Sequence, residues 1–365
     1  MRWPVALVGI LCAASLFADA PLKVGVYCEA GPSGIGAVEW VRLVRDCPQM
    51  ALSLVDDKDV GAGALDGLDL LVMPGGGSKQ EFRSLGTNGV ARLRGFIRNG
   101  GGYFGTCAGC CLLMDGDERV RLFPWNTCGS EADLFYCRFK VNAEGARELG
   151  ISEGDHVIRY HGGPFMWPTT NVIAGADFKV WATFDSEATF RGELKKSKRM
   201  FGAAAMLGGT YGKGRVFVTS AHPEYFESTH YIVKAAFKWL TGREMTFKVR
   251  QRRPRAIAVG VMTGGIPKRV VKVIDAVDAD PELDLVPINK DGMFIGDLQH
   301  VEALVFTGGF PRKDDKKSAA TREAVEKFLA RGGRAFVLGG EGKKPLPEGA
   351  VRCPAENLIS EIRKL

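Results

Sequence analysis

The sequence predicts an α/β protein: a parallel-sheet, flavodoxin-like three-layer sandwich, followed by a second, smaller α/β domain that looks like a degenerate copy. Three observations support this prediction. Short apolar strand segments alternate with amphipathic helical segments, which is the order of a parallel sheet covered by helices on both faces. Glycine-rich turns separate these segments, and the same order occurs twice in 365 residues. At roughly 100–200 residues per domain, the length also predicts two domains.

The first copy begins with an alternating apolar strand at residues 22–27, followed by a helical pattern through Val38, Val41 and Val44. The next segments are expected to be a strand at 51–55, an apolar run at 65–73, a helix around 90–98 and a strand at 103–106. The apolar run ends in Pro74-Gly75-Gly76-Gly77, and the last strand leads directly into Cys107.

The second copy repeats these segments and lacks the candidate nucleophile. Its segments are a strand at 256–262, a helix at 268–277, strands at 285–288 and 301–306, a helix at 321–330 and a strand at 334–338. Aligning Gly332-Gly333 with Gly100-Gly101 places Gly339 opposite Cys107. We expect a structural or dimerising domain, with ligand binding as the alternative.

The first twenty residues predict an export signal. Arg2 precedes an apolar run at 5–17, and Ala18-Asp19-Ala20 forms a cleavage site. This run is shorter than the about twenty residues that span a bilayer. Pro21 is expected to hinder cleavage, so retention of the segment as an N-terminal anchor stays open. We expect an exported protein, periplasmic or secreted, with no other contact with a membrane.

The rest of the chain divides into a first domain at 21–242, a basic linker at 243–255 and the second domain at 256–365. The linker holds six basic residues and one Glu, within a chain of net charge +7. A basic stripe can bind nucleic acid, but a solvated linker explains the same charges with fewer assumptions. No nucleic-acid partner is therefore expected, and the oligomeric state stays open.

Eight cysteines follow the predicted signal, and three of them crowd into the segment Cys107-Ala108-Gly109-Cys110-Cys111. An even number of cysteines in an oxidising compartment favours disulfides, but apolar packing explains the cluster equally well. A redox pair of Cys107 and Cys110 is a minor alternative, because the Trp-Cys-Gly-Pro context of thioredoxin-like sites is absent. The five histidines show no ligand spacing, so no metal is expected.

The segment Gly105-Thr106-Cys107-Ala108-Gly109 fits a nucleophile elbow, in which small residues flank a nucleophile on a sharp strand-to-helix turn. Such a turn raises the side chain above the carboxyl edge of the sheet, where open α/β sheets bind ligands. The helix starting near Ala108 would direct its dipole at the sulfur and lower the Cys107 pKa. A buried apolar cysteine is the alternative interpretation.

A second signal, Ser220-Ala221-His222-Pro223-Glu224, follows the strand predicted at 215–219. Residues two apart in an extended segment project to the same side, so Glu224 can orient the His222 imidazole. His222 would then take the proton from Cys107, completing a Cys-His-Glu triad. A surface His–Glu pair is the alternative interpretation.

The glycine loop supplies a third signal. Backbone N–H groups of Gly76 and Gly77 can turn towards a substrate oxygen without steric penalty and, with the N–H of Ala108, form an oxyanion hole. A plain tight turn is the alternative. A phosphate loop is not expected, because no Gly-Lys-Ser/Thr follows.

In this order, the three motifs resemble the class I glutamine amidotransferase fold. The resemblance is closest to the domain at the N-terminus of eukaryotic-type biotin-protein ligases, which also occurs in free-standing bacterial proteins. It covers about residues 22–242 and includes Gly31-Pro32-Ser33 and Tyr160-His161-Gly162-Gly163-Pro164. It implies Cys107 as nucleophile, His222 as base and Glu224 as orienting residue, with Gly76, Gly77 and Ala108 at the oxyanion. It also implies a substrate-binding loop that contains Tyr160, Gly162 and Gly163.

The chain departs from this family in two ways. Cys110-Cys111-Leu112 stands where glutamine-hydrolysing members carry a Gln, so glutamine is not supported as the substrate. The biotin ligase catalytic domain is missing, so biotin transfer and ATP binding are not predicted and no cofactor is expected.

Two hypotheses for the function follow. An exported cysteine hydrolase or amidase would cleave a C–N or acyl bond of a small-molecule or peptide-like substrate through a thioester. A non-catalytic secreted binding or scaffold protein would keep the fold without the chemistry.

Overall fold

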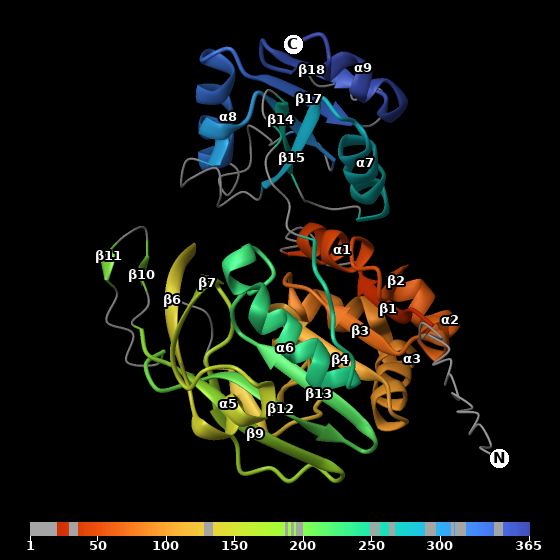
Figure 1. Ribbon diagram of the computed structural model, residues 1–365, viewed down its shortest axis with the longest axis vertical. Coiled ribbons are helices and arrows are strands. Elements are labelled where there is room, and N and C mark those ends of the chain that lie inside the picture. The colour runs from red at the N-terminus through yellow and green to blue at the C-terminus, as the bar shows by residue number, and fades with distance from the viewer. Residues whose placement is uncertain are drawn as a thin grey trace, which may run out of the picture.

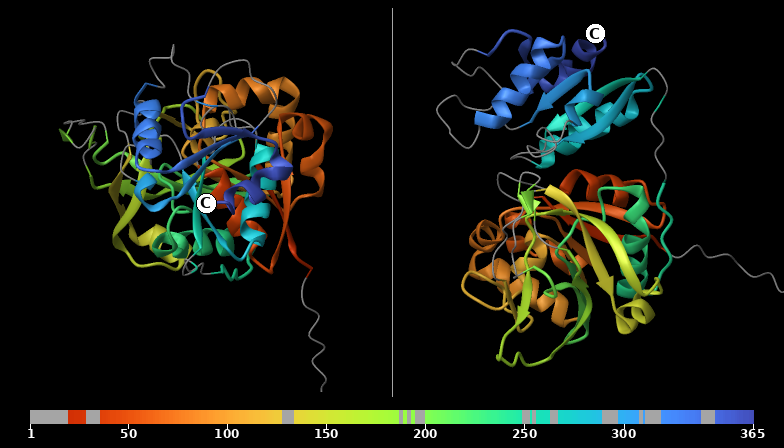
Figure 2. Two further views of the ribbon diagram at one scale, coloured as in Figure 1. Left: turned by 90° about the horizontal axis from the view of Figure 1, so that it is seen from above. Right: turned by 90° about the vertical axis from the view of Figure 1, so that its left-hand side faces the viewer.

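The computed structural model describes residues 20–28, 36–127, 134–186, 189–190, 193–194, 200–248, 253, 256–262, 267–288, 297–307, 310, 319–338 and 346–365. They form two α/β units, each built around its own sheet, as Figure 1 and the right-hand view of Figure 2 show. We call residues 20–248 the first unit and residues 256–365 the second unit. The predicted α/β class with a smaller second α/β part is confirmed. The predictions for the signal segment, Gly31-Pro32-Ser33 and Gly339 fall outside the described residues.

The sheet of the first unit joins a parallel half to an antiparallel half, in the order β2-β1-β3-β4-β13-β12-β9-β6-β7. The parallel strands are β1 (Leu22–Tyr27), β2 (Met50–Val55), β3 (Leu70–Met73), β4 (Gly102–Thr106) and β13 (Gly214–Thr219). The antiparallel strands are β12 (Ala204–Tyr211), β9 (Ala176–Phe184), β6 (Leu134–Val141) and β7 (Gly154–His161). The short strands β5 (Trp125–Thr127) and β8 (Met166–Pro168) extend this sheet, and β10 (Thr189–Phe190) pairs with β11 (Glu193–Leu194).

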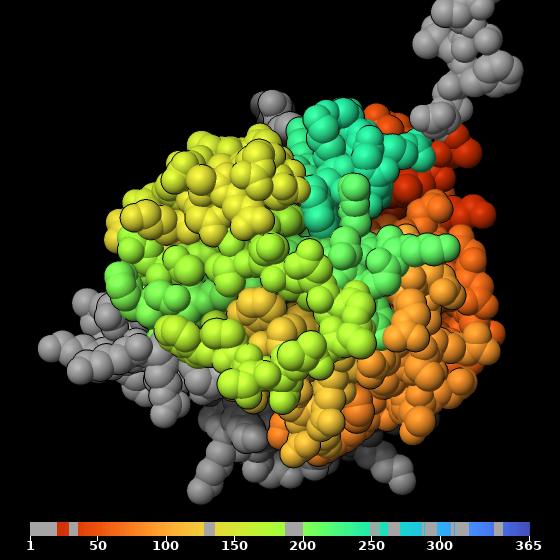
Figure 3. Space-filling view, turned by 90° about the horizontal axis from the view of Figure 1, so that it is seen from below, coloured from red at the N-terminus to blue at the C-terminus, as the bar shows by residue number. Residues whose placement is uncertain are grey.

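Helices cover both faces of this sheet. They are α1 (Ala37–Arg45), α2 (Asp57–Ala62), α3 (Ser78–Arg98), α4 (Ala108–Leu112), α5 (Ala143–Leu149) and α6 (His230–Thr241). One apolar core contains residues of α1 and α6, such as Trp40 and Phe237, and the other contains residues of α3 and α4, such as Leu93 and Leu112. The first unit is therefore a three-layer sandwich. From the end away from the second unit, α3 (orange) and the antiparallel strands (yellow to green) share the surface (Figure 3).

Helix α3 begins twelve residues earlier than the predicted helix at 90–98, at Ser78. Gly86 interrupts it with φ 60° and ψ −176°, which is not helical backbone. Glycine adopts this conformation without the penalty that a Cβ atom would bring. This interruption breaks the helical pattern of the sequence, so the pattern did not predict the part of the helix that precedes Gly86.

The second unit repeats the parallel half of the first. Its strand order, β15-β14-β16-β17-β18, matches β2-β1-β3-β4-β13, and all its strand pairs are parallel. The strands are β14 (Ile257–Met262), β15 (Leu283–Ile288), β16 (Ala303–Phe306), β17 (Arg334–Leu338) and β18 (Ala350–Cys353). The helices are α7 (Pro267–Ala279), α8 (Ala319–Ala330) and α9 (Leu358–Ile362).

The repeat extends to the glycine turn that precedes the strands β4 and β17. A Cβ atom on Gly101 would lie 2.4 Å from the Phe96 ring, and one on Gly333 would lie 2.4 Å from the Phe328 ring. In both turns the glycine N–H donates to the carbonyl of that phenylalanine, at 3.0 Å and 3.1 Å. This agreement supports the predicted alignment of Gly332-Gly333 with Gly100-Gly101.

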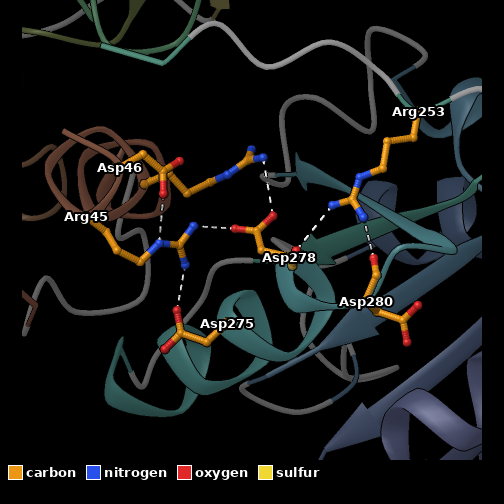
Figure 4. Close-up of polar contacts among 7 residues, drawn as sticks. Arg45, Asp46, Arg253, Asp275, Asp278 and Asp280 are labelled. Atoms are coloured by element: carbon orange, nitrogen blue, oxygen red, sulfur yellow. Dashed lines mark hydrogen bonds and ion pairs between the residues drawn. The ribbon is translucent and has the colours of Figure 1, made fainter. Parts of the chain in front are cut away.

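The two units meet through α1 and α7 (Figure 4). Arg45 on α1 donates to Asp275 on α7 at 2.6 Å and also pairs with Asp278, while Arg42 lies 3.5 Å from Asp278. Val38 on α1 belongs to a core of the second unit. These charged contacts lie beside an apolar contact, so the interface is more than a surface ion pair.

The range predicted as a basic linker contacts both units where the structure describes it. Met245 and Phe247 are buried in the same core as α6. Arg253 donates to the carbonyls of Asp280 at 2.5 Å and Asp278 at 3.2 Å (Figure 4). A solvated linker does not describe Arg253, because its guanidinium is bound at the C-terminal end of α7.

Candidate active site

Cys107 occupies a strained turn between β4 and α4. Its φ of 50° and ψ of −105° fall where residues other than glycine are rare. Its N–H donates to the carbonyl of Thr219 at 3.0 Å, which ties the turn to the end of the neighbouring strand β13. This is the geometry that the nucleophile elbow motif predicts.

The two glycines of the elbow are required by close backbone contacts. A Cβ atom on Gly105 would lie 2.7 Å from the carbonyl oxygen of Gly109. One on Gly109 would lie 2.1 Å from the carbonyl oxygen of Met73, at the start of the glycine loop. The small residues on both sides of Cys107 therefore have a physical reason in this fold.

The glycine loop lies directly beside the elbow. The N–H of Gly109 donates to the carbonyl of Pro74 at 3.2 Å, and Met73 pairs with Gly105 in the sheet. Gly76 and Gly77 are partly exposed, whereas Ala108 is buried. The three predicted oxyanion residues thus come from adjacent segments at the carboxyl edge of the sheet.

His222 and Glu224 form a buried pair, three and five residues beyond the end of β13. Glu224 Oε1 lies 2.7 Å from His222 Nδ1, and both side chains are buried. Burial lowers the pKa of His222, and the nearby His161 and Arg159 lower it further, so the imidazole is neutral at neutral pH. A neutral imidazole held at Nδ1 by a carboxylate is what a general base requires.

The ionisation of Glu224 reflects opposing influences. Burial raises the pKa of Glu224 well above its ordinary value, and its backbone N–H, Arg159 and the polar side chains of Thr106 and Trp40 offset this only in part. The Glu224 carboxylate also lies against the start of α1, because a Cβ atom on Gly36 would be 2.1 Å from Oε1. The acid is therefore fixed by packing as well as by His222.

Cys107 and His222 lie at the ends of adjacent parallel strands, since Thr106 pairs with Thr219. The thiol donates to the carbonyl oxygen of His161 at 3.5 Å. His222 Nε2 has no hydrogen-bond partner among the described residues. The structure therefore contains the predicted pair of His222 and Glu224. The Cys107 thiol is bonded to the last residue of β7.

The thiol of Cys107 is less acidic than the dipole argument predicts. Burial raises its pKa, and nearby Cys111 and Glu81 raise it further, whereas the N–H of Ala108 lowers it. The helix that follows has only five residues, so its dipole is small beside the cost of burying a charge. The resting thiol is protonated, contrary to the expected lowering of its pKa.

The loop after β7 reaches the site through its backbone. A Cβ atom on Gly163 would lie 1.9 Å from the carbonyl oxygen of Ser220, so the loop packs against the segment leading to His222. Gly162 has a φ of 62°. Tyr160 is buried in the core, and its hydroxyl donates to the carbonyl of Gly163 at 2.5 Å. Tyr160 thus braces this loop, and its predicted part in substrate binding stays a prediction.

Sequence reasoning missed three buried charged groups near the site. Burial raises the pKa of Glu39 on α1 to about 7, and that of Glu81 on α3 to about 8. Arg159 on β7 is 7% exposed and lies over the Tyr225 ring at 3.8 Å. Polar residues at such positions look like solvent-facing ones in a sequence. His161 could have been found, because it belongs to the segment Tyr160 to Pro164.

The described cysteines, Cys28, Cys47, Cys107, Cys110, Cys111, Cys137 and Cys353, are all buried, and all of them apart from Cys28 are free thiols. Cys128, the eighth, lies outside the described residues. Within the part of the chain that the structure describes, no group of three or more His, Cys, Asp or Glu side chains could hold a metal ion. No helix in that part is both long and apolar enough to cross a membrane.

Comparisons with solved structures give only weak likenesses. They include the cytoplasmic protein STM1381 from Salmonella typhimurium LT2 (12% identity, 60% of this chain and 98% of that one, TM-score 0.39). They also include a β-galactosidase from Bacillus circulans sp. alkalophilus (12% identity, 63% of this chain and 32% of that one, TM-score 0.40). A third is the carbohydrate deacetylase Agd3 (11% identity, 75% of this chain and 43% of that one, TM-score 0.42). Likenesses this weak carry no argument about function.

A family comparison is more specific. No curated protein matches the chain. Residues 63–112 match the family described as biotin-protein ligase, N terminal. This stretch contains β3, the glycine loop, α3, β4 and the elbow with Cys107. The resemblance to this family is confirmed over these residues.

Proposed function

We propose that this chain is an exported, amidotransferase-like cysteine hydrolase or amidase without biotin ligase activity. Cys107, His222 and Glu224 would act on a C–N or acyl bond of a small-molecule or peptide-like substrate. The observation that carries the proposal is the strained Cys107 turn beside the strand end that holds the His222–Glu224 pair. Strained residues persist where the surrounding structure fixes them, and they cluster at active sites.

The reaction would proceed through a thioester. His222 Nε2 takes the proton of the Cys107 thiol as Sγ bonds to the carbonyl carbon of the substrate. The N–H groups of Gly76, Gly77 and Ala108 would hold the charge on the carbonyl oxygen. The proton then passes from His222 to the leaving nitrogen, and the C–N bond breaks. A water molecule, deprotonated by His222, finally hydrolyses the thioester and restores the thiol.

The thiol must leave the carbonyl of His161 before His222 can take its proton. This requirement agrees with the raised pKa of the resting Cys107, because the thiolate would form only while the proton is transferred. The same observation favours the second candidate function, a non-catalytic secreted binding protein, in which the thiol stays bonded to His161.

Alkylation of Cys107 separates the two functions. We expect iodoacetamide to modify Cys107 below pH 8.5 faster than the buried Cys137, measured peptide by peptide with mass spectrometry. His222→Ala should slow the reaction of Cys107 at least about tenfold, because the proton acceptor is lost. His156→Ala is the matched control, since His156 bonds to Tyr231 and Ser152. Equal reactivity of Cys107 and Cys137, with no effect of His222→Ala, would support the binding protein.

A further inference from the structure

A buried carboxyl group without a partner lies near Cys107. Glu81, in the first turn of α3, is 1% exposed, and neither of its carboxyl oxygens has a hydrogen-bond partner among the described residues. Leaving a buried polar group unsatisfied destabilises the folded protein. A group kept at this cost, beside a candidate nucleophile, points to a ligand that would satisfy it.

Glu81 belongs to a cluster around the first turn of α4. Lys79 and Arg83 lie two residues before and two residues after Glu81 on α3, and both pair with Glu118, the residue before Arg119. In its ionised form Glu81 raises the pKa of Cys107 and that of Cys111, one helical turn further along, and Arg119 lowers the pKa of Glu81. The side chains of Arg119 and Ser78 face the Cys111 thiol and favour its charged form. Arg119 and Ser78 are partly exposed. The cluster therefore extends from the surface to the buried carboxyl group beside Cys107.

The loop that carries Arg119 is strained and held in place. Glu118 and Arg121, on either side of Arg119 and Val120, have φ values of 55° and 57°. Glu118 is bound to α3 by Arg83 at 2.5 Å and Lys79 at 3.6 Å. Arg121 donates to the carbonyl of Gly116 at 2.8 Å. Like Cys107, these residues are non-glycine residues at positive φ, and together they fix the place of Arg119.

We propose that Glu81 and Arg119 recognise the substrate of Cys107, and that this substrate carries a carboxylate and an amide close to the bond that is cleaved. Arg119 would bind the carboxylate with its N–H groups. Glu81 would donate its proton to the amide carbonyl or accept the amide N–H. Because its pKa is about 8, Glu81 is largely neutral at pH 7 and does not repel the carboxylate. N-acylated amino acids and the carboxyl-terminal ends of peptides belong to this class.

This inference rests on the proposed function, because it names the substrate class of the same site. The test compares iodoacetate, which carries a carboxylate, with iodoacetamide, which does not, as reagents for Cys107 in the full chain. The ratio of the two rates cancels the intrinsic reactivity of the thiol. We expect a higher ratio for Cys107 than for N-acetylcysteine. Arg119→Gln should lower it at least about tenfold, since a hydrogen bond to a charged group is lost.

Matched variants complete the test. Arg92→Gln removes the same charge from α3, where Arg92 faces Asp66, and should leave the ratio unchanged. Protection of Cys107 from iodoacetamide by N-acetylglycine should survive in Glu81→Gln, which keeps an amide able to donate and accept, and should disappear in Glu81→Leu. Tryptophan fluorescence would verify that each variant is folded.

The outcomes distinguish the two proposals. If neither reagent modifies Cys107 faster than Cys137, the proposed function fails. If Cys107 is reactive but Arg119→Gln and Arg92→Gln give the same ratio, the subsite assignment is overturned while the proposed nucleophile stands.

Discussion

In the first unit, β4 ends at Thr106 and leads into Cys107, whereas in the second unit the corresponding strand β17 ends at Leu338, next to Gly339, which is outside the described residues. Both strands follow the same glycine turn and occupy the same place in the same strand order. The first unit adds the antiparallel strands β12, β9, β6 and β7 and the segment with His222. The comparison shows that this sheet needs no nucleophile, so Cys107 is an addition to the fold and not a requirement of it.

The units also differ in their buried charges. The first unit buries the side chains of Glu39, Glu81, Arg159, His222 and Glu224. The described residues of the second unit bury only one charged side chain, Asp280, which pairs with Arg363 at 2.7 Å. Burying ionisable groups costs stability, and this cost falls mainly on the first unit. Every Trp and Tyr of the chain precedes residue 243, so their fluorescence reports on the first unit alone.

The largest expected effect comes from Gly109→Ala in the elbow. The added Cβ atom would meet the backbone of Met73, which cannot move away as a flexible side chain could. We expect a loss of more than about 4 kcal/mol of unfolding free energy, or failure to fold, in urea titrations followed by tryptophan fluorescence. In the second unit, Val337 corresponds to Gly105, and Val337→Ala should cost only about 2 kcal/mol by circular dichroism. Similar losses in both variants would contradict this account of the elbow.

A smaller effect concerns pH. The folded-state pKa values of Glu39 (about 7) and Glu81 (about 8) exceed the ordinary value of 4.5, so the folded first unit keeps protons that the unfolded chain releases. This stability is complete at acidic pH and is lost as the pH rises through 7 and 8. We expect the first unit to lose roughly 2 kcal/mol or more between pH 6 and 9 in urea titrations. Glu81→Gln should remove most of this dependence, and an unchanged pH profile in that variant would refute its cause.

The smallest effect tests the repeated turn itself. Gly101→Ala and Gly333→Ala would each press a methyl group against a phenylalanine ring. Phe96 is only partly buried and can turn aside, whereas Phe328 is 1% exposed in the core. We expect a loss of unfolding free energy of about 1 kcal/mol for Gly101→Ala and about 1–2 kcal/mol for Gly333→Ala, measured by fluorescence and by circular dichroism respectively. The opposite order would show that the two turns are packed differently from this account.

The sequence predicted the parallel strands β1, β3, β4 and β17 closely, because they are short, mostly apolar runs that are largely buried on both faces. It did not predict β6, β7 and β9, in which exposed and buried residues alternate. It also predicted the His222–Glu224 pair, since the spacing of two is local. It could not predict Glu81 near Cys107 or Arg119 near Cys111, because the tertiary packing of α3 and a strained loop place them there.

Helix α1 contacts the second unit near one of its ends and the Glu224 side chain at the other. At its C-terminal end, Arg45 pairs with Asp275 and Asp278 of the second unit. At its N-terminal end, Gly36 lies against the carboxyl group of Glu224. A helix of nine residues is rigid and about 14 Å long, so a tilt that moves one end also moves the other. Through α1, the second unit thus supports the position of Glu224, which bonds to His222. Ending the chain after Phe247 would remove the contacts of α1 with Asp275 and Asp278.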